Sequence, residues 1–329
     1  MKRPTATKKV LLLTVLALAA VATLAHADNR VYDPAAGIWV APGSQATLRA
    51  KPTETPKAPK GTLPQAEVTD AFQFPGNLLF TRDLTWDGNN FWVAEIWNTA
   101  LIKLTLVPDP IDPMAGTMQE AGGWYAYGMN PFGLAWDGTN IIEAYFEYSG
   151  NPNDLLDDEV VFHNAVTGAI SNRYLTPDSP DSDPAGATYD PNTGSLWLSE
   201  VMTDTIYELN PADGSVRSSF AAPSTEIRGL AFIDNTLWGV DFANSQLVQM
   251  SLTGEILTQL DISHLSTWGS HPDGLASDGE ALWLGINTPS PDPNDPHPLY
   301  LLRIAIPAGE IFADGFEDGT TDAWSSSTN

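Results

Sequence analysis

The sequence predicts an all-β fold, a single β-propeller made of four-stranded blades. One pattern recurs five times along the chain: a small apolar triplet, an aromatic residue, a turn of the Asp-Gly type and a strand of the Leu-Trp type. A period of roughly 40–50 residues with several short strands in each copy is typical of propeller blades. The five copies begin at Asp83, Gly133, Gly186, Gly229 and Gly274.

Each copy supplies the elements of one blade in order. A glycine after the turn aspartate provides the positive φ that a tight hairpin needs. A third strand follows, as at 100–106 or 205–210, and most copies continue through a second turn into a fourth strand. Large aromatic side chains fill the space between neighbouring sheets well, so we expect the recurring tryptophans to pack between blades. These are Trp92, Trp197, Trp238 and Trp283.

The last copy lacks a fourth strand, because the chain passes from Ile306 into Pro307 and an acidic tail. Residues 66–74 (AEVTDAFQF) resemble the fourth strands of the other copies, and we expect them to pair with residues 299–306. Closure of the ring by an N-terminal strand removes exposed sheet edges. The count is then five blades, and a sixth blade built from residues 28–40 is the alternative.

The two ends of the chain are predicted to lie outside the propeller. Basic residues precede an apolar run at 10–24, which ends in the small-x-small pattern that signal peptidase recognises, Ala25-His26-Ala27. The run is short for a membrane span, and no later segment is apolar enough to cross a bilayer. We therefore expect a secreted or periplasmic protein. The expected division is a signal peptide at 1–27, an arm and Pro-rich linker at 28–65, the propeller at 66–307 and an acidic tail at 308–329.

Charge and cysteine content narrow the classes of partner. The chain has 41 acidic and 15 basic residues, a net charge of −26, and loss of residues 1–27 with their four basic side chains takes it to −30. Such a surface repels phosphate backbones and anionic lipid, which excludes nucleic acid and favours cations and basic ligands. Solubility in an extracellular medium explains the same charge. There is no cysteine, so the fold depends on its core or on bound ions, without disulfides.

Loop lengths predict which face of the ring carries the function. Turns between first and second strands are short, whereas the long insertions mostly follow second strands or connect one blade to the next. These insertions are 149–159, 176–184, 263–272 and 288–298. Functional residues gather on loops held by a rigid scaffold. We therefore expect a ligand site at the channel mouth on the face that bears these loops.

Second strands end at this face in the acidic residues Glu95, Glu200 and Asp241. Carboxylates held close together near the axis would raise one another's pKa or recruit a cation, for which calcium is the candidate. The alternative is that each acid accepts hydrogen bonds from the backbone of its own turn, as a structural feature of the repeat. Trp97 lies on the same rim, where an aromatic ring suits a sugar, a cationic ligand or packing between blades.

Residues 67–307 resemble the NHL, YVTN and SMP-30/gluconolactonase-like propellers. The closest local match is the segment His271-Pro272-Asp273-Gly274-Leu275 with the following Asp278-Gly279 and Leu282-Trp283, which is similar to the PDG…DG…LW segment of SMP-30-like lactonases. The aspartate of that segment is a metal ligand in the family, so the resemblance implies a metal role for Asp273. The family's other ligands lie at corresponding starts of other blades, where this chain has Arg82, Phe132, Ala185 and Arg228.

The end of the chain carries a second resemblance. Residues 311–327 (IFADGFEDGTTDAWSSS) are similar to a short C-terminal motif, IFxDGFExG…W, of exported gammaproteobacterial proteins. The motif occurs on unrelated domains, so it implies a Gram-negative origin and export rather than an activity.

Two functions follow from these observations. The first is an exported binding or interaction module without an assigned catalytic residue, whose ligand is a small molecule, a glycan or a protein; its oligomeric state stays open. Its expected contacts are Glu95, Glu200, Asp241, Asp273, Trp97, Arg82 and Arg228. The alternative is a metal-dependent hydrolase or lactonase of the SMP-30-like type, which requires three or more of these carboxylates to converge on one point. Pairing of the two arginines with the carboxylates would instead give an ion-pair network.

Overall fold

The computed structural model describes residues 63–128, 130–146, 158–179, 182–288 and 299–306. It also gives the backbone of β1 (Val31–Asp33) and β2 (Ile38–Val40), which form a two-stranded sheet of their own. The predicted signal peptide, most of the arm and linker, and the acidic tail lie outside the described residues. Within the described part of the chain, no helix is both long and apolar enough to span a membrane.

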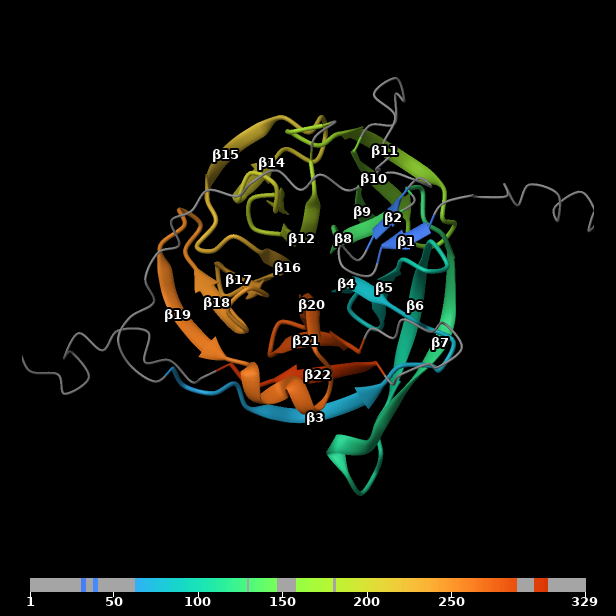
Figure 1. Ribbon diagram of the computed structural model, residues 1–329. Helices are drawn as coiled ribbons and strands as arrows, with labels where there is room; N and C mark the ends of the chain where they lie inside the picture. The colour runs from blue at the N-terminus through green and yellow to red at the C-terminus, as the bar shows by residue number, and fades with distance from the viewer. Residues whose placement is uncertain are drawn as a thin grey trace, which may run out of the picture.

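The strands form sheets arranged around a central axis, with the first strand of each sheet innermost and the fourth on the rim (Figure 1). Three four-stranded sheets stand separately. The first contains β8 (Asn130–Trp136), β9 (Asn140–Phe146), β10 (Glu159–Asn164) and β11 (Ile170–Leu175). The second contains β12 (Pro184–Asp190), β13 (Ser195–Glu200), β14 (Thr205–Leu209) and β15 (Val216–Ala221). The third contains β16 (Ile227–Ile233), β17 (Thr236–Asp241), β18 (Gln246–Met250) and β19 (Ile256–Asp261).

The remaining strands form one eight-stranded sheet in the order β20-β21-β22-β3-β7-β6-β5-β4. One half contains β20 (His271–Ser277), β21 (Leu282–Asn287), β22 (Tyr300–Ile304) and β3 (Val68–Gln73). The other contains β4 (Thr81–Trp86), β5 (Phe91–Glu95), β6 (Ala100–Val107) and β7 (Gly116–Tyr125). Short 3-10 helices occur at Pro113–Ala115 and Ser263–Thr267.

The N-terminal strand joins the last copy of the repeat, as the sequence predicts. β3 runs antiparallel beside β22, with Gln73 opposite Tyr300 and Asp70 opposite Arg303. This confirms the pairing expected between 66–74 and 299–306. On its other side β3 pairs in parallel with β7, at Phe72 and Gln73. The two halves of the eight-stranded sheet therefore meet at the rim, and neither outer strand is left as a fully open edge.

The Asp-Gly turns are stabilised by the aspartate side chain, which explains their spacing from the tryptophan. In the first copy, Asp87 accepts hydrogen bonds from the backbone N–H groups of Asn89 and Asn90 at 2.9 and 2.7 Å. Its second oxygen accepts from the indole Nε1 of Trp92 at 2.9 Å. The positive φ of 93° falls on Gly88, where glycine is the least strained residue.

The tryptophans pack between neighbouring sheets, which confirms the expectation from the repeat. Trp92 contacts the core that includes Leu134 of the next copy, and Trp283 contacts the core that includes Phe91 of the first copy. All four recurring tryptophans are at most 4% exposed. Each therefore contributes to the contact that holds one copy against the next, where apolar burial stabilises the ring.

The innermost strands come so close together at the axis that most of them require glycine there. A Cβ atom added to Gly274 would lie 2.9 Å from the Cα of Asp83, and one added to Gly133 would lie 3.1 Å from the backbone nitrogen of Ala187. Added Cβ atoms on Gly186 and Gly229 would overlap backbone of the adjacent copy. Asp83 occupies the corresponding position in the first copy and is the only one of the five that carries a side chain beyond hydrogen.

The carboxylate of Asp83 joins three other innermost strands at this axis. It is fully buried and accepts backbone N–H groups from Leu134 at 2.9 Å, Ala187 at 3.2 Å and Leu275 at 3.2 Å. Burial raises the pKa of Asp83 well above its ordinary value, and the backbone donors partly offset this effect. One carboxyl group thus links three of the other innermost strands where the strands approach one another most closely.

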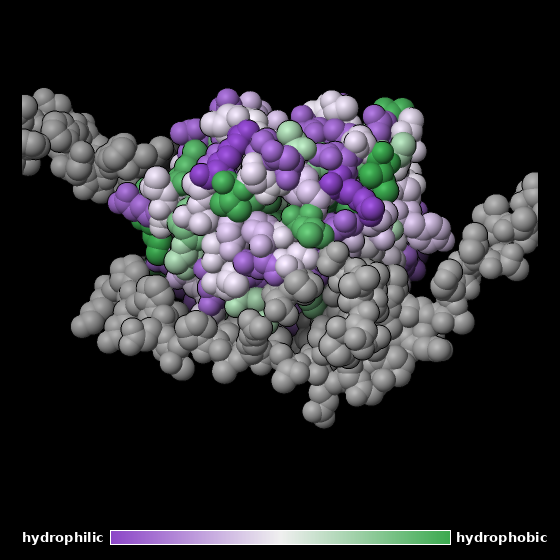
Figure 2. Space-filling view, turned by 90° about the horizontal axis from the view of Figure 1, so that it is seen from above, coloured by the Kyte–Doolittle hydropathy of each residue, from purple (hydrophilic) through white to green (hydrophobic). Residues whose placement is uncertain are grey.

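The side of the ring shown in Figure 2 is mostly hydrophilic, with apolar residues scattered among polar ones. Scattered apolar side chains are ordinary on protein surfaces, whereas a continuous apolar patch marks an interaction site. The coloured residues visible in this view do not form such a patch.

Candidate functional site

Each innermost strand carries a β-bulge where it passes the axis. The register shifts between residues 81 and 84 in β4, between 227 and 230 in β16, and between 272 and 275 in β20. β8 and β12 have the same irregularity. Bulges change the direction of side chains and are common beside functional sites. In three strands the residue at the bulge is charged: Arg82, Arg228 and Asp273.

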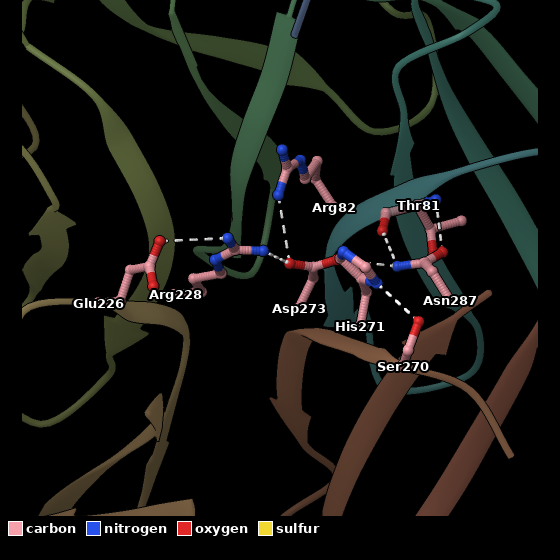
Figure 3. Close-up of polar contacts among 8 residues, drawn as sticks. All are labelled: Thr81, Arg82, Glu226, Arg228, Ser270, His271, Asp273 and Asn287. Atoms are coloured by element: carbon pink, nitrogen blue, oxygen red, sulfur yellow. Dashed lines mark hydrogen bonds and ion pairs between the residues drawn. The ribbon is translucent and has the colours of Figure 1, made fainter. Parts of the chain in front are cut away.

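These three charged side chains meet at one point, although they come from three different strands (Figure 3). Asp273 is 1% exposed, and its Oδ1 accepts hydrogen bonds from Nη1 of Arg82, at 3.2 Å, and from Nη1 of Arg228. Its Oδ2 accepts from Nδ2 of Asn287 at 3.1 Å. Burial raises the pKa of Asp273, but the charges of Arg228 and Arg82 outweigh it and hold the pKa below its ordinary value. Asp273 is therefore ionised at neutral pH.

Aromatic rings lie beside both guanidinium groups. The Cζ atom of Arg82 lies over the rings of Phe80 and Phe132, 5.1 and 4.6 Å from their centroids. Arg228 lies over Phe242, with its Cζ atom 3.5 Å from the centroid. A cation on an aromatic face is attracted by the electrons of the ring, more strongly where water is excluded. Both arginines are therefore positioned by contacts with aromatic rings as well as by their ion pairs with Asp273.

Asn287 connects this group to the first innermost strand. Its Oδ1 accepts hydrogen bonds from the backbone nitrogen and the hydroxyl of Thr81, at 3.0 and 3.1 Å. Its Nδ2 donates to the carbonyl oxygen of Thr81 at 2.6 Å and to Asp273. All hydrogen-bonding groups of this amide are used. The Asn287 side chain therefore links β21 to β4 and, through its bond to Asp273, orients that carboxylate.

Two further polar residues lie on the outer side of the ion pairs. Glu226 accepts from Nη2 of Arg228 at 3.3 Å, and its side chain is 27% exposed. His271 is half-buried, with Nδ1 2.9 Å from the hydroxyl of Ser270 and its ring 5.4 Å from that of Phe242. Burial, together with the charges of Arg228 and Arg82, lowers the pKa of His271 against the opposing effect of Asp273. The imidazole is therefore neutral at neutral pH.

Glu95 and Glu200 have a different role, since each caps the turn that follows its own strand. Glu95 accepts N–H groups from Phe80, Trp97 and Asn98, at 3.1, 3.3 and 2.6 Å. Burial raises the pKa of Glu95, and these backbone donors oppose the rise. Trp97 is half-buried in the same turn.

Glu200 and Asp241 repeat this arrangement in two other copies. Glu200 accepts backbone N–H groups from Asp183, Met202 and Thr203, at 2.6, 3.0 and 2.6 Å. Burial raises the pKa of Glu200 against these donors. Asp241 accepts the backbone and side-chain nitrogens of Asn244, at 3.1 and 2.8 Å. The acids at the ends of the second strands are thus engaged by their own turns, which is the structural alternative that the sequence left open.

The surroundings of Asp273 do not fit a calcium ion. Two of the three groups that bind its carboxylate are guanidinium groups, whose fixed positive charges oppose a cation at the same place. In the described parts of the chain, no three or more His, Asp and Glu side chains are grouped so that they could hold a metal ion. The metal role that the family resemblance implies for Asp273 is therefore not supported by the geometry, because two arginines bind its carboxylate.

Sequence reasoning identified Asp273, Arg82 and Arg228 but missed several partners. Asn287 gave no signal, because three of the other copies end this strand in an acid and no copy repeats an amide at this position. Glu226 precedes its strand and belongs to no repeated position. Asp83 did carry a signal, since it stands where the other four copies have glycine.

No protein-family model and no curated protein sequence matches the chain. Among solved structures, it is similar to glutaminyl cyclase of Myxococcus xanthus, with a TM-score of 0.53 and 14% identity over 73% of this chain and 96% of that one. Streptogramin B lyase gives a TM-score of 0.40 and 15% identity over 68% and 93% of the two chains. A nidogen/laminin complex gives a TM-score of 0.41 and 14% identity, over 63% of this chain and 72% of that one. At such identities the likeness concerns the fold alone, and the chain has a β-propeller fold.

Proposed function

We propose that this chain is an exported propeller of five four-stranded blades that binds a small ligand at the mouth of its ring. The binding residues are Asp273, Arg82, Arg228 and His271, at the starts of three innermost strands. The count of five is supported by three separate four-stranded sheets and by the two halves of the eight-stranded sheet. No catalytic residue is assigned.

The observation that carries this proposal is the buried charge group itself. Two guanidinium groups and one carboxylate lose most of their hydration at this point, and each buried ion costs several kcal/mol unless it is well paired. Stability alone does not call for such a group, because apolar residues of similar volume often stabilise a fold as well or better. Perturbed charged groups concentrate at functional sites. The β-bulges of three innermost strands lie at these same charged residues, which also indicates a functional site here.

The metal-dependent hydrolase is the weaker candidate on the same geometry. It needs several carboxylates around one ion, whereas Glu95, Glu200 and Asp241 are each bonded to their own turns. Asp273 is the remaining carboxylate of the expected set, and it is paired with Arg82 and Arg228. A binding site that uses guanidinium donors and aromatic surfaces agrees with these contacts better.

A fragment screen by ligand-observed NMR tests this function. Small polar aromatic compounds and sugars are screened against the native protein, Arg228→Gln and Arg217→Gln. Arg217 serves as the control because it bonds elsewhere, to the carbonyl oxygens of Thr193 and Gly194. We expect fragments that bind the native protein and Arg217→Gln but bind Arg228→Gln about tenfold more weakly, a difference of about 1.4 kcal/mol.

The folding of each variant is checked by its melting temperature, and His271→Gln provides a second, milder change at the same site. Fragments that bind both arginine variants and His271→Gln as tightly as the native protein would place binding elsewhere and contradict the proposal.

A further inference from the structure

We propose that the mouth of the ring recognises a carboxylate group on an aromatic or apolar ligand, and that Glu226 occupies the place of this carboxylate until the ligand displaces it. The inference rests on the proposed ligand site and adds the chemical class of the ligand. It also assigns Glu226 a role as an internal competitor. Three features of the site support it: the arginines at the mouth, the weak contact of Glu226 and the rings beside Arg228.

The positive charges at the mouth are unusual for this chain. The described residues include only six Lys and Arg side chains, and two of these, Arg82 and Arg228, share a single carboxylate oxygen of Asp273. Arg228 also extends beyond this shared carboxylate, because its Nη2 atom is directed to Glu226. Arginine binds carboxylates through paired, charge-assisted hydrogen bonds. The overall acidity favours cations at the surface, but the outward Nη2 of Arg228 favours an anionic group at the mouth.

Glu226 supplies the opposing charge in the present structure, and it is held loosely. It meets Arg228 from the side opposite to Asp273 (Figure 3). Their N–O distance is 3.3 Å, and more than a quarter of the Glu226 side chain is exposed. Asp273, in contrast, is 1% exposed and is held by three side chains. A partly exposed ion pair is worth little and exchanges readily, whereas a buried one does not. Glu226 is therefore the partner that a ligand can replace.

The surroundings of Arg228 indicate what the rest of such a ligand would contact. Phe242 covers one flat side of the guanidinium at 3.5 Å. The ring of His271 lies 5.4 Å from Phe242 and 6.2 Å from Phe80. Aromatic surfaces at these distances favour offset or edge contacts with another ring. A carboxylate on Nη2 of Arg228 would thus bring an attached aromatic or apolar group beside these rings.

The test compares three probes of nearly equal shape: benzoate, benzamide and benzylamine. Each is titrated calorimetrically into the native protein, Glu226→Gln and Glu255→Gln at 0.15 M salt, where the Debye length is about 8 Å. Glu255 is exposed in the turn between β18 and β19, so its substitution changes the net charge equally without touching the site. Loss of a competitor worth up to about 1 kcal/mol corresponds to about a fivefold gain in affinity. We expect this gain for benzoate with Glu226→Gln only.

The outcomes separate this inference from the function on which it rests. Benzoate that binds Glu226→Gln no more tightly than Glu255→Gln, or benzamide that binds as well as benzoate, would overturn carboxylate recognition. If benzamide or benzylamine then still binds the native protein and is lost in Arg228→Gln, the ligand site stands without the inference. If none of the three probes binds any of the variants, the inference is overturned, and the fragment screen decides the function separately.

Discussion

Replacement of Asp83 by alanine will lower the free energy of unfolding by about 3 kcal/mol or more. Its carboxylate accepts N–H groups from Leu134, Ala187 and Leu275, and each buried donor that loses its acceptor costs about 1–3 kcal/mol. Urea denaturation measures the change. Asp83→Gly is the informative second variant, because glycine stands at this position in the other four copies. An Asp83→Gly protein as stable as the native one would show that the carboxylate does not hold the ring together.

The same residue predicts a dependence of stability on pH. Because the pKa of Asp83 in the folded state lies above its ordinary value of 3.8, the folded state binds this proton more tightly than the unfolded chain does. The resulting stabilisation is fully present below pH 3.8 and is lost as the pH rises through the folded-state pKa. We expect the native protein to lose stability relative to Asp83→Asn as the pH is raised from about 4 to 8. A difference that does not vary with pH would contradict this.

Replacement of Asp273 by alanine has the second large effect, about 3–5 kcal/mol, because it leaves two guanidinium groups without their shared buried counter-ion. The pH dependence has the opposite sign to that of Asp83. The pKa of Asp273 lies below 3.8 in the folded state, so its stabilisation is fully present above 3.8 and is lost as the pH falls through the lower value. The cost of Asp273→Ala should therefore be constant from about pH 5 to 8 and shrink in stronger acid.

Glu159→Gln is the control for Asp273→Ala. It breaks an ion pair with Arg173, at 3.4 Å, in which the arginine side chain is 51% exposed, and such a pair contributes less than about 1 kcal/mol. Denaturation of the two variants side by side measures the difference. If Asp273→Ala costs no more than Glu159→Gln, the charge group at the mouth is not held together as the contacts indicate.

The parts of the fold that the sequence predicts are those encoded by local and repeated patterns. In the first and last copies the turn aspartate bonds to a tryptophan only five residues away, so the pattern Asp-Gly followed by Trp predicts this hairpin. The closing strand followed from a count of strands, and the pairing of β3 with β22 confirms it. The packing of the recurring tryptophans followed from their period and is also confirmed.

The site was harder to predict, because its contacts join residues that are distant in the sequence. Asp83 bonds to residues 51, 104 and 192 positions away, and Arg82 lies 191 positions from Asp273. A repeat shows that Asp273 is at the start of a strand near the axis, but not which side chains face it there. The resemblance to metal-binding propellers selected Asp273 and suggested a metal as its partner. The partners in the structure are arginines that other copies of the repeat contribute.

The acids at the ends of the second strands show a second limit of sequence reasoning. Recurrence alone does not distinguish a ring of ligands from a repeated turn cap. Glu95 and Glu200 each accept two backbone N–H groups from the turn that follows. Each also accepts one from the residue before the neighbouring first strand, Phe80 or Asp183. Only the geometry of those turns distinguishes a turn cap from a ligand, and the sequence pattern does not specify that geometry.

A crystal structure of the native protein soaked with the tightest-binding fragment tests the central claim most directly. The account predicts the fragment at the mouth of the ring, in contact with Arg228 and His271, with Asp273 still paired to Arg82. The contrary result is a fragment bound only on the rim or on the opposite face, with the mouth unchanged, and it would show that the buried charge group is structural.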